Sequence, residues 1–376
     1  MVESAVESAA GFPNEALSLR STRALRLVAL GGGINGNSDA YSRTLHDLGD
    51  HLLIVLSATS ENTAFEPLQA LERSEIVAWD EHQDPQLLID RVAAFRPDAI
   101  MSAGWNIPSS YRKVMKQQPS HVLRMMFMDS IWQSSPKQWV GRGLHPLLIK
   151  PLFDVAFVPS ERTEFMARRI GFGPRDIIRG AYTADTPLFD SGPRSGEELA
   201  SRRRFLFVGR LIPFKGVDVL AQAYRRYRAE VPDPWDLHIV GLGPEEHHLK
   251  DVEGVTMRGF LQSSEVATLM HESSCLVLTS NGEHYGLVVH EAAAAGLPLL
   301  VSETAGAVPG LIQDGYNGWS VPEGDVAAWS ASMTRMAGQP AERLGEMSAI
   351  SHALSTRLSP SGWARNLHEE IYRRTS

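Results

Sequence analysis

Residues 205–217 read FLFVGRLIPFKGV, and this stretch decides the fold. Its first four residues are apolar, which predicts a short buried β-strand, and Gly209 ends that strand in a turn. An amphipathic helix follows, with Asp218 in its first turn. A buried strand, a glycine turn and a helix together form the repeating unit of a parallel α/β sheet.

The same unit recurs along most of the chain. In the first half, apolar runs predict strands at 25–30, 52–56, 99–102, 122–128 and 155–158. In the second half, they predict strands at 205–208, 237–240, 255–257, 275–279 and 299–302. Helical patterns between the strands predict right-handed crossovers. The predicted fold class is therefore α/β, with two Rossmann-like domains whose parallel sheets face a central cleft.

Composition divides the chain further. Residues 190–204 are rich in Gly, Pro, Ser and charge, which is typical of a hinge, so the first domain is 23–189 and the second is 205–360. Residues 1–22 carry glutamates and lack a long apolar run, which predicts a flexible tail rather than a signal peptide. Residues 361–376 predict a last helix that can pack back on the first domain.

Composition also excludes several classes of protein. The 376 residues are 43% hydrophobic and 21% charged, close to the average for soluble globular proteins, so a disordered scaffold is excluded. A single cysteine, Cys275, can form neither an internal disulfide nor a thiolate metal site, which favours the cytoplasm and predicts no metal. The net charge of −8 argues against nucleic acid as a partner. No apolar run is long enough to span a membrane.

One segment departs from this acidic average. Residues 101–150 contain seven basic residues against a single acid, Asp129. The basic residues are Arg112, Lys113, Lys116, Arg124, Lys137, Arg142 and Lys150. A solvated helix face, an anionic acceptor and peripheral contact with the inner face of an anionic membrane all remain open as explanations.

The loop that Gly209 opens carries two cations, Arg210 and Lys215. In a parallel sheet this loop lies at the carboxyl end of a strand, where ligands bind. A guanidinium can bind two oxygens at once and an ammonium acts as a point charge, so we expect the pair to clamp a diphosphate.

The stretch 280–298, SNGEHYGLVVHEAAAAGLP, carries two glutamates eight positions apart. Glu283 lies in the loop after the strand at 275–279, and Glu291 lies a turn inside a short helix that begins near Gly286. A carboxylate can bind the vicinal hydroxyls of a ribose or a hexose, and the helix start can receive phosphate oxygens. A solvated loop acid and a helix-stabilising acid remain the alternatives.

Two further loops are rich in small residues. GGGING at 31–36 includes Gly32 and Gly33, but no acid follows at 56–58, as a dinucleotide fingerprint requires. A phosphate- or acceptor-facing loop and a plain structural turn both remain open. In the loop at 303–318, Gly306 and Ala307 are expected to present backbone N–H groups to a diphosphate, with a simple turn as the alternative.

In this order, the four stretches resemble the retaining glycosyltransferases of GT-B architecture, of the family 4 or group 1 kind. The likeness is most continuous from residue 205 to about 325, and its strongest point is the pair of glutamates around Tyr285-Gly286. It implies transfer of a sugar from a nucleotide-diphosphate donor, UDP- or GDP-linked, to an acceptor hydroxyl with retention of configuration. It implies no cofactor and no metal. The implied setting is bacterial glycan, glycolipid or natural-product biosynthesis, with a sugar, a lipid-linked glycan or a small molecule as acceptor.

The resemblance also implies roles for individual residues. Arg210 and Lys215 would bind the diphosphate beside Gly209, Glu291 the ribose and Glu283 the transferred sugar. Backbone N–H groups of Gly286 and Leu287 would complete the donor site. Arg258 and Phe260 would lie at the base. The loop residues expected to contribute are Gly306, Ala307, Gly32 and Gly33. Where the family has a histidine near the transferred sugar, this chain has Met128-Asp129-Ser130, so Asp129 is the expected substitute.

Three rival functions remain open. A glycoside hydrolase also uses two carboxylates, but it would leave Arg210 and Lys215 without a role. An inert nucleotide-sugar-binding subunit would keep the donor site without turnover. A nucleotide-sugar epimerase or a glycosyl phosphorylase of similar architecture would need no acceptor other than water or phosphate.

Overall fold

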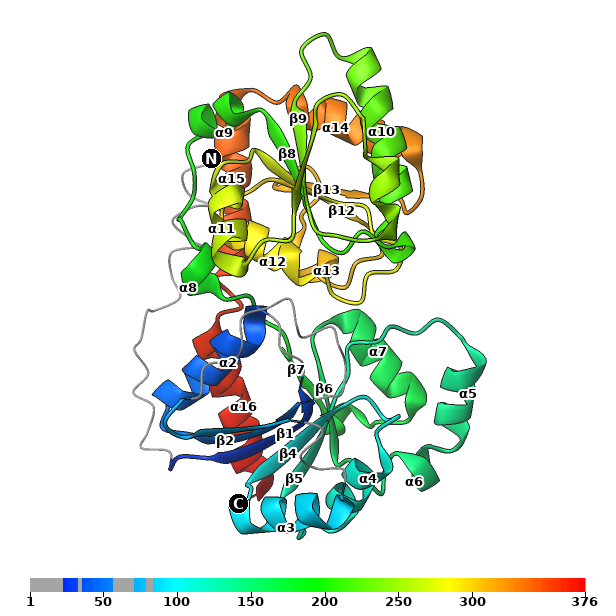
Figure 1. The fold of residues 1–376 in the computed structure, drawn as a ribbon, viewed down its shortest axis with the longest axis vertical. Helices are drawn as coiled ribbons and strands as arrows, with labels where there is room; N and C mark the ends of the chain where they lie inside the picture. The colour runs from blue at the N-terminus through cyan, green and yellow to red at the C-terminus, as the bar shows by residue number, and fades with distance from the viewer. Residues whose placement is uncertain (1–22, 33–35, 57–70, 79–83, 376) are drawn as a thin grey trace.

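A computed structural model describes residues 23–32, 36–56, 71–78 and 84–375. The predicted tail at 1–22 and Gly33 lie outside the described residues. Two parallel sheets form two domains, one above the other in Figure 1, as the alternation of strands and helices predicts. Among the described residues, no helix is both long and apolar enough to cross a bilayer.

The first sheet has the strand order β3-β2-β1-β4-β5-β6-β7. Its strands are β1 (Arg26–Gly32), β2 (His51–Leu56), β3 (Ser74–Val77), β4 (Ala99–Ala103), β5 (Leu123–Phe127), β6 (Val155–Val158) and β7 (Ile177–Arg179). The helices between them are α2 (Gly36–Asp47), α3 (Pro85–Phe95), α4 (Ser109–Lys116), α5 (Pro136–Gly143), α6 (His145–Leu148) and α7 (Glu161–Ile170). The two edge strands, β3 and β7, are short and were not predicted from the apolar runs.

The second sheet has the strand order β10-β9-β8-β11-β12-β13. Its strands are β8 (Arg204–Val208), β9 (Asp236–Val240), β10 (Val255–Gly259), β11 (Cys275–Leu278), β12 (Leu299–Ser302) and β13 (Gly318–Val321). Its longer helices are α10 (Val217–Glu230), α11 (Ser263–His271), α12 (Leu287–Ala294), α14 (Val326–Ala337) and α15 (Ala341–Ser355). A short helix, α13 (Val308–Leu311), follows β12.

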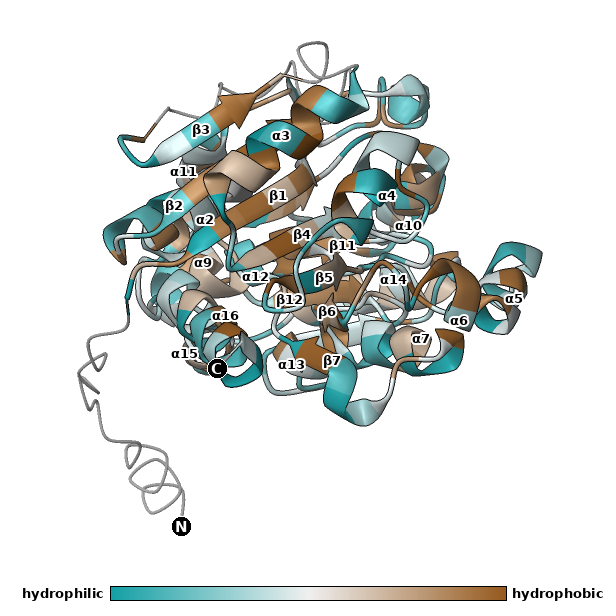
Figure 2. Ribbon diagram, turned by 90° about the horizontal axis from the view of Figure 1, so that it is seen from below, coloured by the Kyte–Doolittle hydropathy of each residue, from teal (hydrophilic) through white to brown (hydrophobic). Residues whose placement is uncertain are grey.

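Side chains that alternate along the strands of the first sheet build two separate cores, one on each face. One face, with Val28, Ile100 and Met126, packs with residues of α3, α4 and α7. The other face, with Leu27, Ala99 and Met125, packs with residues of α2 and of the last helix, α16 (Pro360–Thr375). The strands are hydrophobic along most of their length, whereas the covering helices are mixed (Figure 2), as burial of the sheet on both faces requires.

The predicted hinge at 190–204 is instead part of the second domain. It contains α9 (Gly196–Arg202), whose Leu199 is fully buried in the core of the second domain. A Cβ atom on Gly196 would overlap the carbonyl oxygen of Ala341, so α9 lies directly against α15. Polar composition predicted a loose linker, but close packing of a glycine against a neighbouring helix overrides that signal.

The chain crosses between the domains near Ala184 and again near Ser355, and both crossings are bonded to His290 of α12. The backbone N–H of Ala184 donates to Nδ1 of His290 at 3.0 Å, and Nε2 lies 3.0 Å from the carbonyl oxygen of Ser355. The ring is fully buried, and that burial lowers the pKa of His290 to about 4. After the second crossing, α16 returns to the first domain, where Trp363 stacks on Tyr41 of α2.

Candidate functional site

The loops that follow β8 and β11 are bonded to each other. The hydroxyl of Thr279 donates to the carbonyl oxygens of Lys215 at 3.0 Å and of Gly216 at 3.1 Å. The N–H of Asn281 donates to the carbonyl oxygen of Phe214 at 2.8 Å. Gly216 has φ 61°, and a Cβ atom there would overlap the carbonyl oxygen of Thr279, so only glycine allows the two loops to approach this closely.

This contact brings together two residues that the sequence assigned to different parts of a donor. Nζ of Lys215 forms an ion pair with Oε2 of Glu283, and the two side chains are 16% and 10% exposed. In a partly buried place, each charge offsets the desolvation of the other. Arg210, on the same loop, is exposed. The site therefore contains a paired ammonium and carboxylate, and Arg210 lies on the same loop as the ammonium.

The helix α12 begins directly after this pair. Gly286 precedes it with φ 87°, in the left-handed region that favours glycine, and Leu287 is the first helical residue. The first N–H groups of a helix have no partners within the helix, so this end can accept an anion. Glu291 is half-buried one turn further on, and its charge contributes to raising the pKa of Tyr41 in the first domain, after the larger effect of burial. Glu283 therefore lies in the loop before α12 and Glu291 within that helix.

Gly306 and Ala307 do not present their backbone N–H groups to a ligand. The N–H of Gly306 donates to the carbonyl oxygen of Glu283 at 3.1 Å, and that of Ala307 donates to the carbonyl oxygen of Tyr285 at 2.8 Å. A Cβ atom on Gly306 would overlap the carbonyl oxygen of His284. The small residues are needed because two loops touch here, which corrects the expectation that they bind the diphosphate. They do line a cavity of about 390 Å³ between the domains.

The other predicted donor residues lie at the carboxyl ends of their strands. Gly209 follows β8, and Arg258 and Phe260 lie at the end of β10, with β9 between the two strands. Arg258 is exposed, and its Nη2 lies 3.4 Å from Nδ1 of His238. In the first domain, Gly32 is the last residue of β1.

Tyr182, to which the sequence pattern assigned no role, lies between Asp129 and the second domain. The hydroxyl of Tyr182 donates to Oδ2 of Asp129 at 3.1 Å, and its ring lies 5.3 Å from that of Tyr285. Burial, with the charges of Asp129 and Glu283 nearby, raises the pKa of Tyr182 well above its ordinary value. Tyr182 therefore bonds to Asp129 of the first domain and contacts Tyr285 of the second.

The loop that carries Asp129 is held by a buried glutamine. Gln138 accepts from the N–H of Gln133 at 2.8 Å and donates to the carbonyl oxygen of Ile131 at 2.8 Å. A Cβ atom on Gly282 would lie 3.9 Å from Nε2 of Gln133 and 4.0 Å from Cδ1 of Ile131, so this loop meets the Glu283 loop. Nothing in the sequence pattern identified Thr279, Gln138 or Tyr182, because their roles depend on segments far away in the chain. Within the described part of the chain, no three His, Cys, Asp or Glu residues are grouped as a metal site would need.

Residues 202–339 match the family model described as Glycosyl transferases group 1. Over 182 residues the chain is 34% identical to glycogen synthase of Mycobacterium tuberculosis, a match that covers 45% of this chain and 42% of the relative. The chain therefore spans less than half the length of that curated relative. These matches show that the second half of the chain is similar to group 1 glycosyl transferases.

Two solved structures are similar over nearly the whole chain. HepE of Anabaena, in complex with UDP and glucose, has a TM-score of 0.68 at 18% identity and covers 93% of this chain and 100% of its own. Sucrose-phosphate synthase of Thermosynechococcus elongatus has a TM-score of 0.69 at 18% identity and covers 93% of this chain and 98% of its own. The fold is GT-B. In this GT-B chain, the loops after β8, β11 and β5 meet between the two domains, and they form the candidate active site.

Proposed function

We propose that the protein is a retaining glycosyltransferase that moves a hexosyl group from a nucleotide-diphosphate sugar to an acceptor hydroxyl. The observation that carries this proposal is the bonded pair of loops that brings Lys215, Glu283 and the start of α12 to one place beside Arg210. The matches to group 1 glycosyltransferases support the same conclusion. The solved complexes of HepE with UDP and with UDP-glucose support a nucleotide-sugar donor, and we extend the expectation to UDP- or GDP-linked sugars.

Charge at the leaving group supplies the catalysis in this proposal. As the diphosphate departs, the anomeric carbon gains positive character and the phosphate oxygens gain negative charge. Lys215, Arg210 and the N–H groups at Gly286 and Leu287 would stabilise that negative charge. Lys215 is paired with Glu283 in the structure, so donor binding would separate the pair and leave the carboxylate for hydroxyls of the transferred sugar.

The remaining roles follow from position. Glu291 would bind the ribose, Arg258 and Phe260 would lie against the base, and Asp129 would contact the transferred sugar or the acceptor hydroxyl from the first domain. Retention would come from acceptor attack on the face from which the diphosphate leaves, with the departing phosphate taking the proton. No metal is assigned to this reaction, because in this proposal two cations and a helix start would already face the diphosphate.

A ligand screen tests the donor site. We expect UDP or GDP to raise the melting temperature of the full chain, because a ligand that binds only the native state stabilises it. The Lys215→Ala variant should lose that shift. A donor that stabilises the protein without transfer or slow hydrolysis would favour an inert binding subunit instead. Turnover with phosphate alone would favour a phosphorylase, and turnover without any acceptor would favour an epimerase.

Peripheral contact with an anionic membrane is the second part of the proposal. The helices α5 and α6 expose Trp139, Val140 and Leu147, which are 50%, 54% and 73% exposed. Basic residues of the same segment, Lys137 and Arg142, lie on α5 beside them. Exposed aromatic and aliphatic side chains with neighbouring cations suit the boundary between headgroups and acyl chains.

Vesicle sedimentation tests this contact. We expect the protein to bind vesicles of phosphatidylcholine with phosphatidylglycerol, and to bind pure phosphatidylcholine more weakly, since each nearby cation contributes about 1 kcal/mol at an anionic surface. Leu147→Ser and Trp139→Ser should weaken binding. Leu87→Ser is the matched control, because Leu87 is 56% exposed on α3 of the same domain. Equal effects at all three positions would contradict the assignment.

A further inference from the structure

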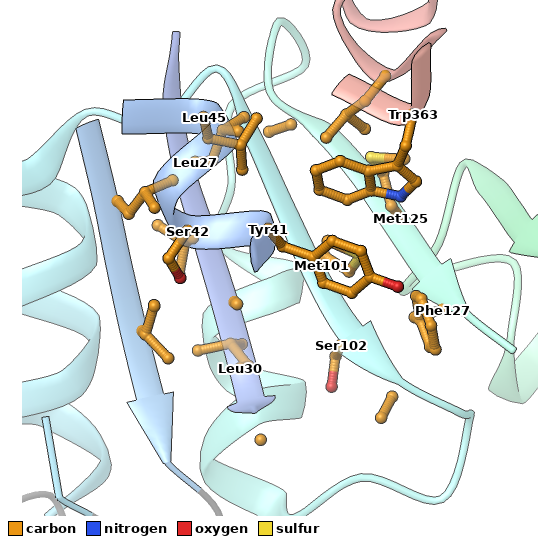
Figure 3. Close-up of a pocket in the computed structure, with 18 of the residues that line it drawn as sticks. Leu27, Leu30, Tyr41, Ser42, Leu45, Met101, Ser102, Met125, Phe127 and Trp363 are labelled. Carbon is orange, nitrogen blue, oxygen red and sulfur yellow. The ribbon is translucent and has the colours of Figure 1, made fainter. Parts of the chain in front are cut away.

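The first domain contains a cavity of about 530 Å³ between its sheet and the helices α2 and α16. Its floor is formed by β1, β2, β4 and β5, and its other side by residues of the two helices (Figure 3). Tyr41 of α2 and Trp363 of α16 both line it, and their rings stack with centroids 4.5 Å apart. The stacked pair therefore joins the two covering helices over the sheet.

Most of the lining surface is apolar. Met101 and Phe127 lie in the middle of the sheet and are half-buried rather than buried, because no side chain of the described residues fills the space in front of them. On the opposite face of the same sheet, Met126 and Ile100 are fully buried. Protein interiors are normally packed as closely as organic crystals. A gap of this size on one face only, at the size of a typical ligand pocket, suits an apolar ligand.

The cavity is continuous with the candidate active site. Asp129, Ser130 and Tyr182 belong to its lining, and Tyr182 also approaches Tyr285 of the second domain. Ser102, in the lining at the end of β4, is 2% exposed, and its hydroxyl has no partner among the described residues. Nε1 of Trp363 also has no hydrogen-bond partner among the described residues, and this residue is 7% exposed. The apolar space therefore has polar groups in its lining, and Asp129 belongs both to that lining and to the candidate site.

Among the described residues that line the cavity, Asp129 is the only charged one. A carboxylate in the lining can accept a hydrogen bond from a neutral hydroxyl, whereas it repels a phosphate or a carboxylate. The occupant is therefore expected to carry an uncharged, hydroxyl-bearing head. Its apolar part would lie between the sheet and the two helices.

We propose that this cavity binds the aliphatic part of a neutral, amphiphilic acceptor and so places its hydroxyl at Asp129. The inference rests on the proposed glycosyl transfer and narrows its acceptor to an apolar alcohol or an alkyl glycoside. Among the acceptors that the sequence leaves open, it selects molecules with an aliphatic chain over free sugars and over anionic lipids.

A chain-length series tests the cavity directly. Butyl, hexyl, octyl and decyl β-D-glucosides, each below its micelle concentration, are titrated into the full chain by calorimetry. Each added CH₂ that becomes buried should tighten binding by about fourfold, and the gain should stop when the cavity is full. Octyl phosphate should bind more weakly than octyl glucoside. A flat series, or the reverse order of the two head groups, would overturn the proposal.

Two variants at one position localise the effect. Met101→Trp fills the cavity and should remove the chain-length dependence, whereas Met101→Ala enlarges it and should move the limit to a longer chain. Dependence on chain length that persists unchanged in both variants would place the chain elsewhere and would also overturn the proposal. Met101→Ala keeps the test valid if the tryptophan variant does not fold.

The donor response separates the two hypotheses. The shift of melting temperature with UDP or GDP is measured on the same samples, because the donor loops lie in the other domain. A normal nucleotide response with a flat glucoside series refutes the apolar acceptor site alone. A missing nucleotide response with a steep glucoside series refutes the proposed transferase and leaves an apolar binding site.

Discussion

The two domains share one architecture and differ in how tightly they are packed. In the second domain, one continuous core fills both faces of the sheet, and glycines at 216, 241 and 306 let neighbouring loops touch backbone to backbone. In the first domain, the core is divided between two faces, and one face keeps a cavity of about 530 Å³. The family match, at 202–339, covers the tightly packed domain.

This difference teaches where the chain is constrained. Under the proposed function, the loops of the second domain would hold charges in place for a leaving diphosphate, and misplacement by about 1 Å can cost about 10²-fold in rate. The first domain would have a different task, since it would accommodate one acceptor among many. Tight packing would then go with the shared chemistry, and the unfilled sheet face with the specific substrate.

The largest expected effect is on turnover, when Arg210 or Lys215 of the second domain is replaced. Arg210→Ala and Lys215→Ala should each lower turnover by about 10²–10³-fold, the usual cost of removing one group that stabilises transition-state charge. Arg210→Ala should leave the melting temperature nearly unchanged because Arg210 is exposed. Lys215→Ala leaves the carboxylate of Glu283 without its partner, and Lys215→Ala/Glu283→Gln should recover the lost stability without recovering turnover. Single-turnover kinetics and thermal melts measure both; unchanged turnover in either single variant contradicts the donor site.

A matched pair of glycines tests the tight packing of the same domain. Gly306→Ala should destabilise the chain by about 2–3 kcal/mol, because its methyl group would meet the carbonyl oxygen of His284. Gly310 lies in α13, only four residues away, and a Cβ atom there meets nothing within 4 Å. Gly310→Ala should therefore be neutral, or stabilising by up to about 1 kcal/mol. Urea unfolding of both variants decides the matter, and equal destabilisation would show that the loops are not in direct contact.

The free energy of unfolding should depend on pH through His290, which lies where the chain crosses between the two domains. Burial lowers the pKa of His290 to about 4, below its ordinary value of 6.5, so the unfolded chain takes up the proton first as pH falls. Neutral His290 makes its full contribution to the unfolding free energy above pH 6.5. That contribution falls by roughly 3 kcal/mol as the pH is lowered to about 4. His290→Gln should lose this dependence. The measurement is the difference in unfolding free energy between wild type and variant at pH 7 and at pH 4, and a constant difference would contradict it.

The smallest effect compares the two faces of the first sheet. Met126→Trp places extra volume on the filled face and should cost about 1–3 kcal/mol. Met101→Trp places the same volume into the cavity and should change the unfolding free energy by less than about 1 kcal/mol. Denaturant unfolding of the two variants compares them directly. An equal loss of unfolding free energy in the two variants would mean that side chains fill the cavity in solution.

Much of the fold could be predicted from local pattern. The strand at 155–158 and the strand at 299–302 coincide with β6 and β12, because a run of apolar residues is long enough to mark a buried strand. The edge strands β3 and β7 and the strand β13 escaped prediction because they are short and only partly apolar. Alternation of strands and helices predicted parallel sheets, whereas the order of the strands within each sheet came only from the structure.

The candidate site was predictable only in part. Arg210, Lys215 and Glu283 could be singled out because each follows a strand within a few residues. The use of Gly306 and Ala307 could not, since their N–H groups bond to a loop that the sequence pattern does not connect with them. Tyr182 also escaped, because its partners Asp129 and Tyr285 come from both domains.

The amino-acid order alone determined the class of fold, the loops that bear charge and the likeness of the second half to a known group of transferases, because each is written in residues close together in the chain. Only the tertiary structure decided that Lys215 pairs with Glu283, that residues 190–204 pack into the second domain, and that one face of the first sheet is left open. These three features depend on how side chains from distant segments share volume and satisfy charge. That balance is settled by packing and desolvation, and no local pattern records it.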